Sequence, residues 1–329
     1  RRREDLPAGL DGVVEIVPPE LNLYEKLKRV HISWPASREE TWAWTDVASR
    51  MMECGQALCV VNTRKKARVL FEEIRQRGGR GFHLSTTMCP AHRMAVIDEV
   101  KNLLVHHQTC LLVSTQLIEA GVDLDFPVVF RELGPLESII QAAGRCNREG
   151  TLPKCDGLPG GRVFVFRSDQ SGGPGGWYRS GQDIVEQNFL GLGRLPDIAS
   201  PQDVEEYFRR LYSYGDTDQN HIADLRAQLD FPEVSRNYRL IEDVGAQTVV
   251  VQTWERERQT VTDLLEALRS KPTRAAYRKL APYSVNIFPW DEISLRSVIQ
   301  ADTGCQIYMG PYDEHLGARG DGPLPSLIG

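Results

Sequence analysis

Short apolar runs alternate with amphipathic stretches through the first half of this chain, and this alternation restricts the fold more than any other feature. Parallel strands need long crossover connections, which are usually helices, so the pattern predicts a parallel β-sheet covered by helices. Strands are predicted at 29–34, 57–62, 81–85, 110–114, 128–131 and 162–166. Helices are predicted between them at 41–53, 64–77, 91–105 and 137–148.

The run Ser-Gly-Gly-Pro-Gly-Gly at 171–176 interrupts this alternation and predicts a linker, because glycine and proline disfavour regular structure. Beyond the linker the periodicity changes, and it predicts a smaller α+β part. Its helices are expected at 182–190, 201–212, 220–228 and 256–270, and its strands at 237–241, 248–252, 283–288 and 306–309.

Composition excludes several classes of protein. The chain has 329 residues, contains no apolar run of about 18 residues and opens with no charged-then-apolar leader. We therefore expect neither a membrane span nor a secretory signal, and a cytoplasmic location. The seven cysteines form no Cys-x-x-Cys pair and are odd in number, which favours free thiols over disulfides or a zinc site, and no metal site is predicted.

Charge is distributed unevenly along the chain. The formal net charge of −6 argues against indiscriminate wrapping of nucleic acid. Residues 62–101, however, carry nine lysines and arginines against four acidic residues. This segment predicts a local basic face that suits a phosphate backbone, although a solvated helix surface has a similar composition.

The segment Gln-Ala-Ala-Gly-Arg-Cys-Asn-Arg at 141–148 spaces one glutamine and two arginines at helical intervals. If the segment is helical, Gln141, Arg145 and Arg148 fall on one face. Two guanidinium groups directed at one point favour a polyanion such as a triphosphate. A surface helix with two arginines is common, so the segment alone leaves an ordinary solvated face open.

Three predicted strands end in small hydroxyl or amide residues. Helix N-capping explains any one such case, whereas three aligned cases followed by basic residues suggest a row of phosphate contacts. These strand ends carry Asn62 and Thr63, Ser85 and Thr86, and Ser114 and Thr115.

A glycine and an aspartate follow the third of these strand ends. Gly121 permits a tight turn, and the carboxylate of Asp123 could accept a hydrogen bond from a ribose hydroxyl. A turn aspartate that bonds its own backbone is the alternative.

The order of these segments resembles the second RecA-like domain of a superfamily-two helicase. More narrowly, Glu-Ala-Gly-Val-Asp-Leu-Asp at 119–125, together with the segment at 141–148 and Leu-Ser-Thr-Thr-Met-Cys-Pro-Ala-His-Arg at 84–93, resembles the CRISPR-associated helicase-nuclease of type I systems. The segments 283–287 and 312–317 resemble that family's C-terminal accessory domain. Ala142 departs from the arginine usual at its position, which we expect to affect packing only.

The resemblance implies roles for individual residues. Arg145 and Arg148 would act as arginine fingers on the γ-phosphate of ATP, with Gln141 helping to position the water or phosphate. Asp123, beside Gly121, would contact the ATP ribose. Single-stranded DNA would be held through its phosphate backbone by Asn62, Thr63, Arg64, Ser85, Arg93, Thr115 and Gln116.

The resemblance also implies a domain plan. Residues 1–28 would lead in from a preceding half, 29–170 would form the second RecA-like domain, 171–176 the linker, and 177–329 the accessory domain. The sequence contains no phosphate-binding lysine loop, no strand-ending Asp-Glu box and no His-Asp pair, since Asp98-Glu99 is expected in the middle of a helix, and the first residue is arginine rather than methionine. In the family, those motifs belong to the first half. We therefore expect the C-terminal half of an ATP-dependent DNA translocase, which cannot hydrolyse ATP alone.

The expected ligands and partners follow from the same resemblance. ATP and Mg²⁺ would be bound mainly by the first half. The partners would be single-stranded DNA, the first RecA-like domain, the His-Asp nuclease domain and the CRISPR RNA-guided surveillance complex, with no membrane. Two alternatives stay open, namely a non-catalytic RecA-like adaptor that binds nucleic acid and half of a superfamily-two helicase from DNA repair.

Overall fold

A computed structural model describes residues 11–12, 14, 16–119, 121–154, 156–170, 172–213, 218–238, 245–288 and 297–320. The chain divides into two compact units, each built from two separate stretches of sequence. The first unit comprises residues 1–43 and 125–239, and the second comprises 44–124 and 240–329. Among the described residues, no helix combines the length and the apolar character that crossing a membrane requires.

A six-stranded sheet has the strand order β1-β6-β5-β2-β4-β3. Its strands are β1 (Val30–Ser33), β2 (Gln56–Val60), β3 (Gly81–Leu84), β4 (Cys110–Ser114), β5 (Val128–Glu132) and β6 (Gly161–Phe166). The pairs β1–β6, β5–β6, β2–β4 and β3–β4 are all parallel. β4 and β5 are buried along their whole length, which matches the apolar run of β4, whereas β5 ends in the buried charged residues Arg131 and Glu132.

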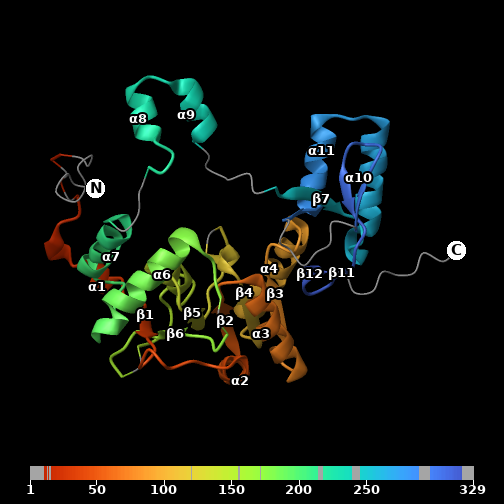
Figure 1. The fold of residues 1–329 in the computed structure, drawn as a ribbon. Coiled ribbons are helices and arrows are strands. Elements are labelled where there is room, and N and C mark those ends of the chain that lie inside the picture. Colours follow the sequence, from red (N-terminus) through yellow and green to blue (C-terminus); the bar gives the residue numbers. More distant parts are fainter. Residues whose placement is uncertain are drawn as a thin grey trace. The chain divides into compact units, whose positions relative to one another are not determined.

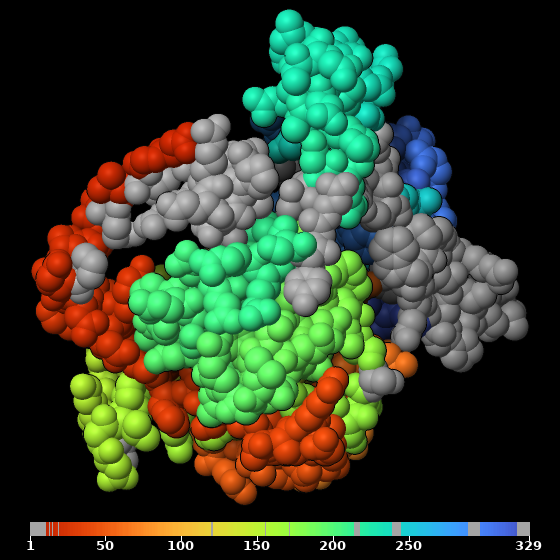
Figure 2. Space-filling model, turned by 60° about the vertical axis from the view of Figure 1, so that its left-hand side comes forward, coloured from red at the N-terminus to blue at the C-terminus, as the bar shows by residue number. Residues whose placement is uncertain are grey.

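The first unit packs helices α5 (Leu136–Ala143), α6 (Gly176–Asn188) and α7 (Pro201–Ser213) around an apolar cluster. Leu136, Ile139, Val185 and Phe189 form part of this cluster and are fully buried. Helices α6 and α7 lie side by side (Figure 1) and form a continuous surface in the space-filling view (Figure 2). The unit also contains three short helices, α1 (Leu23–Lys26), α8 (Ile222–Ala227) and α9 (Phe231–Asn237).

The second unit begins with helices α2 (Trp44–Cys54), α3 (Arg64–Gln76) and α4 (Pro90–Val105) around β2, β3 and β4. Its later part contains a mixed sheet with the order β8-β7-β10-β9 and a two-stranded hairpin. These strands are β7 (Gln247–Val251), β8 (Ser284–Ile287), β9 (Val298–Gln300) and β10 (Gln306–Tyr308), with β11 (Tyr312–Asp313) and β12 (Gly317–Ala318) in the hairpin. Helices α10 (Arg258–Ser270) and α11 (Arg274–Leu280) lie beside each other (Figure 1).

The predicted fold class is confirmed, with a parallel sheet interleaved with helices and a smaller α+β part. All six predicted strands of the first half exist, with ends within two residues of those expected. The helix expected at 137–148 ends at Ala143, so its second half was wrong. The predicted strand at 237–241 was also wrong at Asn237, which ends α9, and residues 239–241 lie outside the described residues. The boundary at 171–176 stays a prediction.

Candidate functional site

The two arginines of the segment 141–148 lie beyond the end of helix α5. Gly144 is the C-cap of α5, and Arg145 and Arg148 occupy the irregular turn that follows. Asn147 adopts a left-handed backbone with φ of 46°, which a helix cannot accommodate. The prediction that Gln141, Arg145 and Arg148 share one helical face was therefore wrong. Residues 144–150, which we call the arginine loop, carry both guanidinium groups instead.

Asp125 holds the arginine loop through its carboxylate. Its two oxygens accept hydrogen bonds from the backbone N–H groups of Arg148 and Glu149, at 2.7 and 3.1 Å. Phe126 adds a bridge with Cys146, since Phe126 N–H donates to the carbonyl of Arg145 at 2.9 Å. Charge-assisted bonds from a carboxylate to backbone amides are among the stronger hydrogen bonds in proteins. Two consecutive residues, Asp125 and Phe126, therefore hold the backbone that carries the arginines.

Arg29 and Asn147 hold the loop from the side of β1. The Arg29 guanidinium donates to the carbonyl of Arg148, and Asn147 Nδ2 donates to the carbonyl of Arg29 at 2.9 Å. The side chains of Arg145 and Arg148 remain half-buried, so part of each stays accessible. The sequence pattern singled out the two arginines as candidates and did not include Asp125 and Arg29, which bond the backbone of their loop.

The other residues that were predicted to contact the nucleotide, Gln141, Gly121 and Asp123, lie in different segments of the chain. Gln141 is exposed on the last turn of α5, and Ala142 beside it is fully buried, consistent with the packing role expected at that position. Gly121 has φ of 73°, so the tight turn predicted there exists. Asp123, two residues later, is exposed. Gly121 and Asp123 belong to the second unit, whereas Gln141 belongs to the first.

The second unit brings three strand ends of the predicted phosphate row together. Leu84 of β3 and Val60 of β2 both lie opposite Ser114 of β4, so the carboxyl ends of the three strands are level. Gln116 Nε2 donates to the carbonyl of Asn62 at 3.2 Å, and Thr115 N–H donates to the carbonyl of Leu84 at 3.3 Å. Residues 62–63, 85 and 115–116 are therefore joined into one edge.

Thr63 and Arg64 stand where this edge meets helix α3. Thr63 is the N-cap of α3, and its hydroxyl accepts from Lys66 N–H at 3.2 Å. N-capping of α3 therefore explains a threonine at position 63, and this was the alternative to a phosphate contact. Arg64 begins the helix and is half-buried. The N-terminus of α3, with its partial positive charge, faces the same edge as the strand ends.

Ser85 is fully buried and its hydroxyl is engaged inside the protein. It shares a hydrogen bond of 2.7 Å with Thr87 Oγ1, and Thr87 in turn donates to the carbonyl of Leu316 at 2.6 Å. Ala318 N–H donates to the carbonyl of Thr87 at 2.9 Å. The β11–β12 hairpin thus clamps the segment that follows β3, a connection across more than 200 residues that local sequence patterns could not reveal.

His92 and Tyr312 form the centre of this clamp. Tyr312 Oη accepts from Cys89 N–H and lies 3.0 Å from His92 Nδ1, while His92 Nε2 lies 3.1 Å from the carbonyl of Glu314. The imidazole also stacks on Trp254 with ring centroids 4.8 Å apart. Burial lowers the pKa of His92 to about 4, so the ring is neutral near pH 7. Nε2 therefore carries the proton and donates to the Glu314 carbonyl.

Comparison with known proteins relates this chain to one family. A family model described as CRISPR-associated nuclease/helicase Cas3, C-terminal, matches residues 53–151. A protein of Haloferax volcanii, named CRISPR-associated nuclease/helicase Cas3, is 32% identical over 225 residues, which cover 60% of this chain and 23% of that protein. The chain thus spans about a quarter of the length of this relative.

Two solved structures share the fold at low sequence identity. The T. fusca Cas3–AMPPNP structure gives a TM-score of 0.53 at 14% identity and covers 88% of this chain and 42% of that one. A chain of a CRISPR RNA-guided surveillance complex, pre-nicking, gives 0.51 at 15% identity and covers 88% and 44%. Together with the sequence matches, these findings confirm the resemblance that the motifs indicated.

Proposed function

This chain resembles the C-terminal helicase part of the CRISPR-associated nuclease/helicase Cas3, and from this premise we propose that it is one half of an ATP-dependent translocase on single-stranded DNA. It supplies Arg145 and Arg148 to an ATP site and holds the DNA backbone along the edge formed by β2, β3 and β4. It does not hydrolyse ATP without a first RecA-like domain. The activity serves CRISPR interference against foreign DNA.

The geometry of the arginine loop carries this proposal. Asp125 and Arg29 fix the loop backbone, while Arg145 and Arg148 are half-buried. Two cationic side chains on one fixed loop suit a polyanion such as the triphosphate of ATP, because a fixed backbone reduces the reorganisation needed when negative charge develops. Arginine fingers of this kind contribute ~10³-fold or more in rate.

ATP and Mg²⁺, when bound, would supply a phosphoanhydride bond and a Lewis acid for its hydrolysis. The residues of this chain neutralise the charge of the phosphates and orient the nucleotide. Arg145 and Arg148 stabilise charge on the γ-phosphate, Gln141 helps to position the water or phosphate, and Asp123 accepts from the ribose. Mg²⁺ is held mainly by the first RecA-like domain.

The edge of the second unit supports the DNA-binding part of the proposal. The side chains of Asn62 and Thr115 are buried there, Gln116 is half-buried, and Arg64 lies at the N-terminus of α3. Arg64, Gln116 and the backbone N–H groups at this helix N-terminus suit phosphate groups and contact no bases, so they would bind a strand without sequence preference. Asn62, Ser85 and Thr115, being buried, act as positioning residues, Ser85 through Thr87.

A reconstitution of the ATPase tests the proposal. The chain is assayed for ATP turnover alone and after addition of the polypeptide that carries the first RecA-like domain, with single-stranded DNA present. We expect negligible turnover alone and DNA-stimulated turnover in the mixture. Arg145→Ala and Arg148→Ala should each reduce that turnover by ~10³-fold. Arg209→Ala, which removes an exposed arginine from α7, serves as the matched control.

Two results would overturn the proposal. Turnover by the chain alone that survives Arg145→Ala would mean that the chain carries a different active site. Full activity of the reconstituted mixture with both arginines replaced would favour a non-catalytic adaptor. The recruiting partner is proposed to be an RNA-guided surveillance complex, because one structure of this fold belongs to such a complex.

A further inference from the structure

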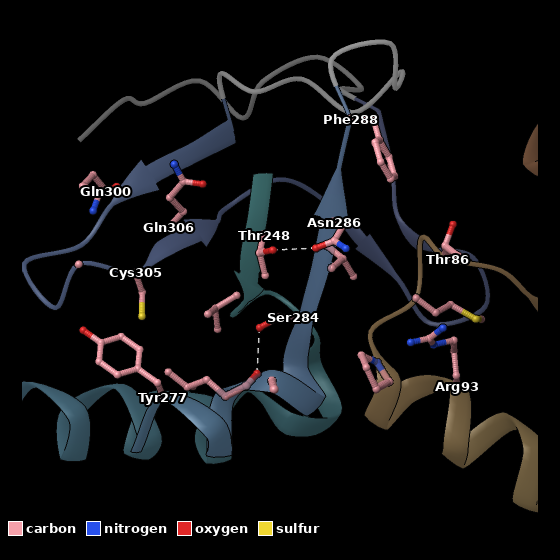
Figure 3. Close-up of a pocket in the computed structure, with 17 residues that line it drawn as sticks. Thr86, Arg93, Thr248, Tyr277, Ser284, Asn286, Phe288, Gln300, Cys305 and Gln306 are labelled. Atoms are coloured by element: carbon pink, nitrogen blue, oxygen red, sulfur yellow. Dashed lines mark hydrogen bonds between the residues drawn. The ribbon is translucent and has the colours of Figure 1, made fainter. Parts of the chain in front are cut away.

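A cavity of about 700 Å³ lies within the second unit, and of the residues named so far for binding it includes only Thr86 and Arg93. It opens between the segment after β3, represented by Thr86 and Arg93, and the mixed sheet, represented by Thr248 on β7 and Asn286 on β8 (Figure 3). We call it the amide cavity. Its volume falls within the range of small-molecule and nucleotide sites in proteins.

The sheet presents a polar face to the amide cavity. Thr248 pairs with Asn286 across β7 and β8, and Val249 and Ile287, which alternate with them, are fully buried on the opposite face. Thr248 Oγ1 lies 2.8 Å from Asn286 Oδ1, as the dashed line in Figure 3 shows. This hydrogen bond orients the side-chain amide, which can both donate to and accept from the edge of a nucleobase.

Aromatic rings also line the amide cavity. Phe288 follows β8, and Tyr277 of α11 stands on the same side as Gln306, where its hydroxyl donates to the carbonyl of Thr303 at 2.6 Å. Planar apolar rings beside amide groups are what a splayed-out nucleobase requires, since its faces stack while its edge forms hydrogen bonds. Thr248 and Asn286 are exposed, so a ligand in the cavity can reach their polar atoms.

Arg93 gives the amide cavity a cationic end. It lies in the first turn of α4, a helix of 16 residues whose N-terminus, at Pro90, also lines the cavity. The positive end of the helix and the guanidinium group together favour a phosphate there. The Tyr312–His92 clamp described above fixes the same turn, so the cationic end is rigidly placed relative to the sheet of the same unit.

We propose that the amide cavity binds one nucleotide of single-stranded DNA, with its base against Asn286 and Phe288 and its phosphate at Arg93. The inference rests on the proposed function, because it assumes that the chain binds a DNA strand at all. It adds a contact to the bases, which the backbone contacts along the β2–β4 edge do not provide. A protein that holds one base as well as phosphates binds normal strands more tightly than strands without bases.

Binding of two strands that differ only in their bases tests this inference. The full chain is titrated with a fluorescent thymidine oligonucleotide of about 12 nucleotides and with an abasic oligonucleotide of equal length. We expect the chain to bind the thymidine strand ~10-fold more tightly, as one stacked and hydrogen-bonded base allows. Asn286→Ala and Phe288→Ala should each remove most of this preference. Gln259→Ala, which removes an exposed amide from α10, should retain it.

The controls separate failure of this inference from failure of the proposed function. Arg64→Ala should weaken binding of both strands by a similar factor, because it acts on phosphates alone. Equal affinity of the unaltered chain for the two strands would overturn the amide cavity as a base site and leave the proposed function standing. Absence of binding to either strand would overturn both. Binding of thymidine monophosphate without any preference between the strands would identify a free nucleotide as the ligand and overturn the strand assignment.

Photo-crosslinking provides a measurement that needs no altered protein. A strand that contains 5-iododeoxyuridine is irradiated in the presence of the full chain, and the attached peptides are identified by mass spectrometry. We expect attachment at Tyr277 or Phe288, the aromatic side chains that line the amide cavity. Attachment confined to peptides elsewhere, in a chain that binds the strand, would overturn the inference even if the Asn286 and Phe288 variants failed to fold.

Discussion

At the scale of single residues, the Asp125 carboxylate accepts from two successive amides of the arginine loop. Asp125→Ala leaves both N–H groups without this acceptor, which we expect to release the loop at a cost of about 1–3 kcal/mol. ATP turnover of the reconstituted pair should fall ~10–100-fold while both arginines remain present. Asp125→Asn, which keeps one acceptor oxygen, should recover part of the loss. Unchanged turnover in Asp125→Ala would show that the loop needs no such support.

Thiol chemistry gives a second residue-scale prediction. Burial raises the pKa of Cys110 and of Cys146 to about 12. At pH 8, only ~1 in 10⁴ of such thiols is ionised, and the thiolate is the reactive form. We therefore expect an aromatic disulfide reagent to modify the half-buried Cys54 and Cys305 and to leave Cys110 and Cys146 intact until the chain unfolds. Rapid native-state labelling of Cys146, read by peptide mass spectrometry, would contradict this expectation.

Two buried histidines make the second unit sensitive to acid. Burial lowers the pKa of both His83 and His92 to about 4, with repulsion from His92 adding to the effect on His83 and attraction to Asp313 opposing it. Neither ring nitrogen of His83 has a hydrogen-bond partner among the described residues. As the pH falls, the two histidine rings therefore bind protons near pH 6.5 in the unfolded chain but only near pH 4 in the folded chain.

The stability that the neutral rings contribute is consequently complete above pH 6.5 and is lost as the pH falls from 6.5 towards 4. We expect a slope of up to about 1.4 kcal/mol per pH unit for each histidine in that window. Urea unfolding measured at a series of pH values tests this. His83→Phe, which keeps a ring of similar shape beside Phe71, should flatten the dependence, and an unchanged slope in that variant would assign the acid sensitivity elsewhere.

At the scale of elements, the β11–β12 hairpin depends on a glycine. Gly317 has φ of 79°, and a Cβ there would collide with the carbonyl of Thr87. Gly317→Ala should therefore displace the hairpin from the segment after β3, lower the melting temperature by several degrees and weaken binding of single-stranded DNA. Gly193→Ala, at φ of 69° with open space around it, isolates the effect of the backbone conformation alone. Equal effects of the two changes would argue against a role for the Thr87 contact.

The elements that the sequence predicted well are those whose pattern is local. The strands of the six-stranded sheet were found because each is a short apolar run between helical periodicities. Helix α5 was extended too far because the spacing of Gln141, Arg145 and Arg148 was given more weight than Gly144, which is its C-cap. Tertiary contacts then hold the residues after Gly144 in a non-helical turn, namely the Phe126–Cys146 bridge and the Asp125 carboxylate, which come from a segment some 20 residues earlier.

The residues of the candidate site also fall into two groups, those that local sequence could predict and those that it could not. Thr63 and Gly121 could be predicted because capping and positive φ depend on neighbouring residues. Thr87, Tyr312 and Arg29 could not, because their contacts join segments more than a hundred residues apart in sequence. Such contacts are set by the fold and produce no periodic pattern in the sequence.

At the scale of the whole molecule, the two compact units do not follow the chain in order. Each is assembled from one early and one late stretch, so residues 125–239 interrupt the second unit. Residues 172–175 of the Gly-rich run precede α6, which begins at Gly176. Compactness depends on contacts between distant stretches, and the domain boundary predicted at this run stays a prediction.

The negative net charge of the chain disfavours DNA binding, whereas local cationic side chains favour it. The salt dependence of binding distinguishes the two contributions. The chain carries a formal charge of −6, so attraction to DNA must come from local phosphate contacts rather than from the overall field. With Arg64 and Arg93 as the charged contacts, the logarithm of the association constant should fall with the logarithm of salt concentration at a slope of about −1.4. Arg64→Ala should reduce the magnitude of that slope by ~0.7, whereas Arg209→Ala, on exposed α7, should leave it unchanged. A steep slope that is insensitive to Arg64 would place the DNA on another surface.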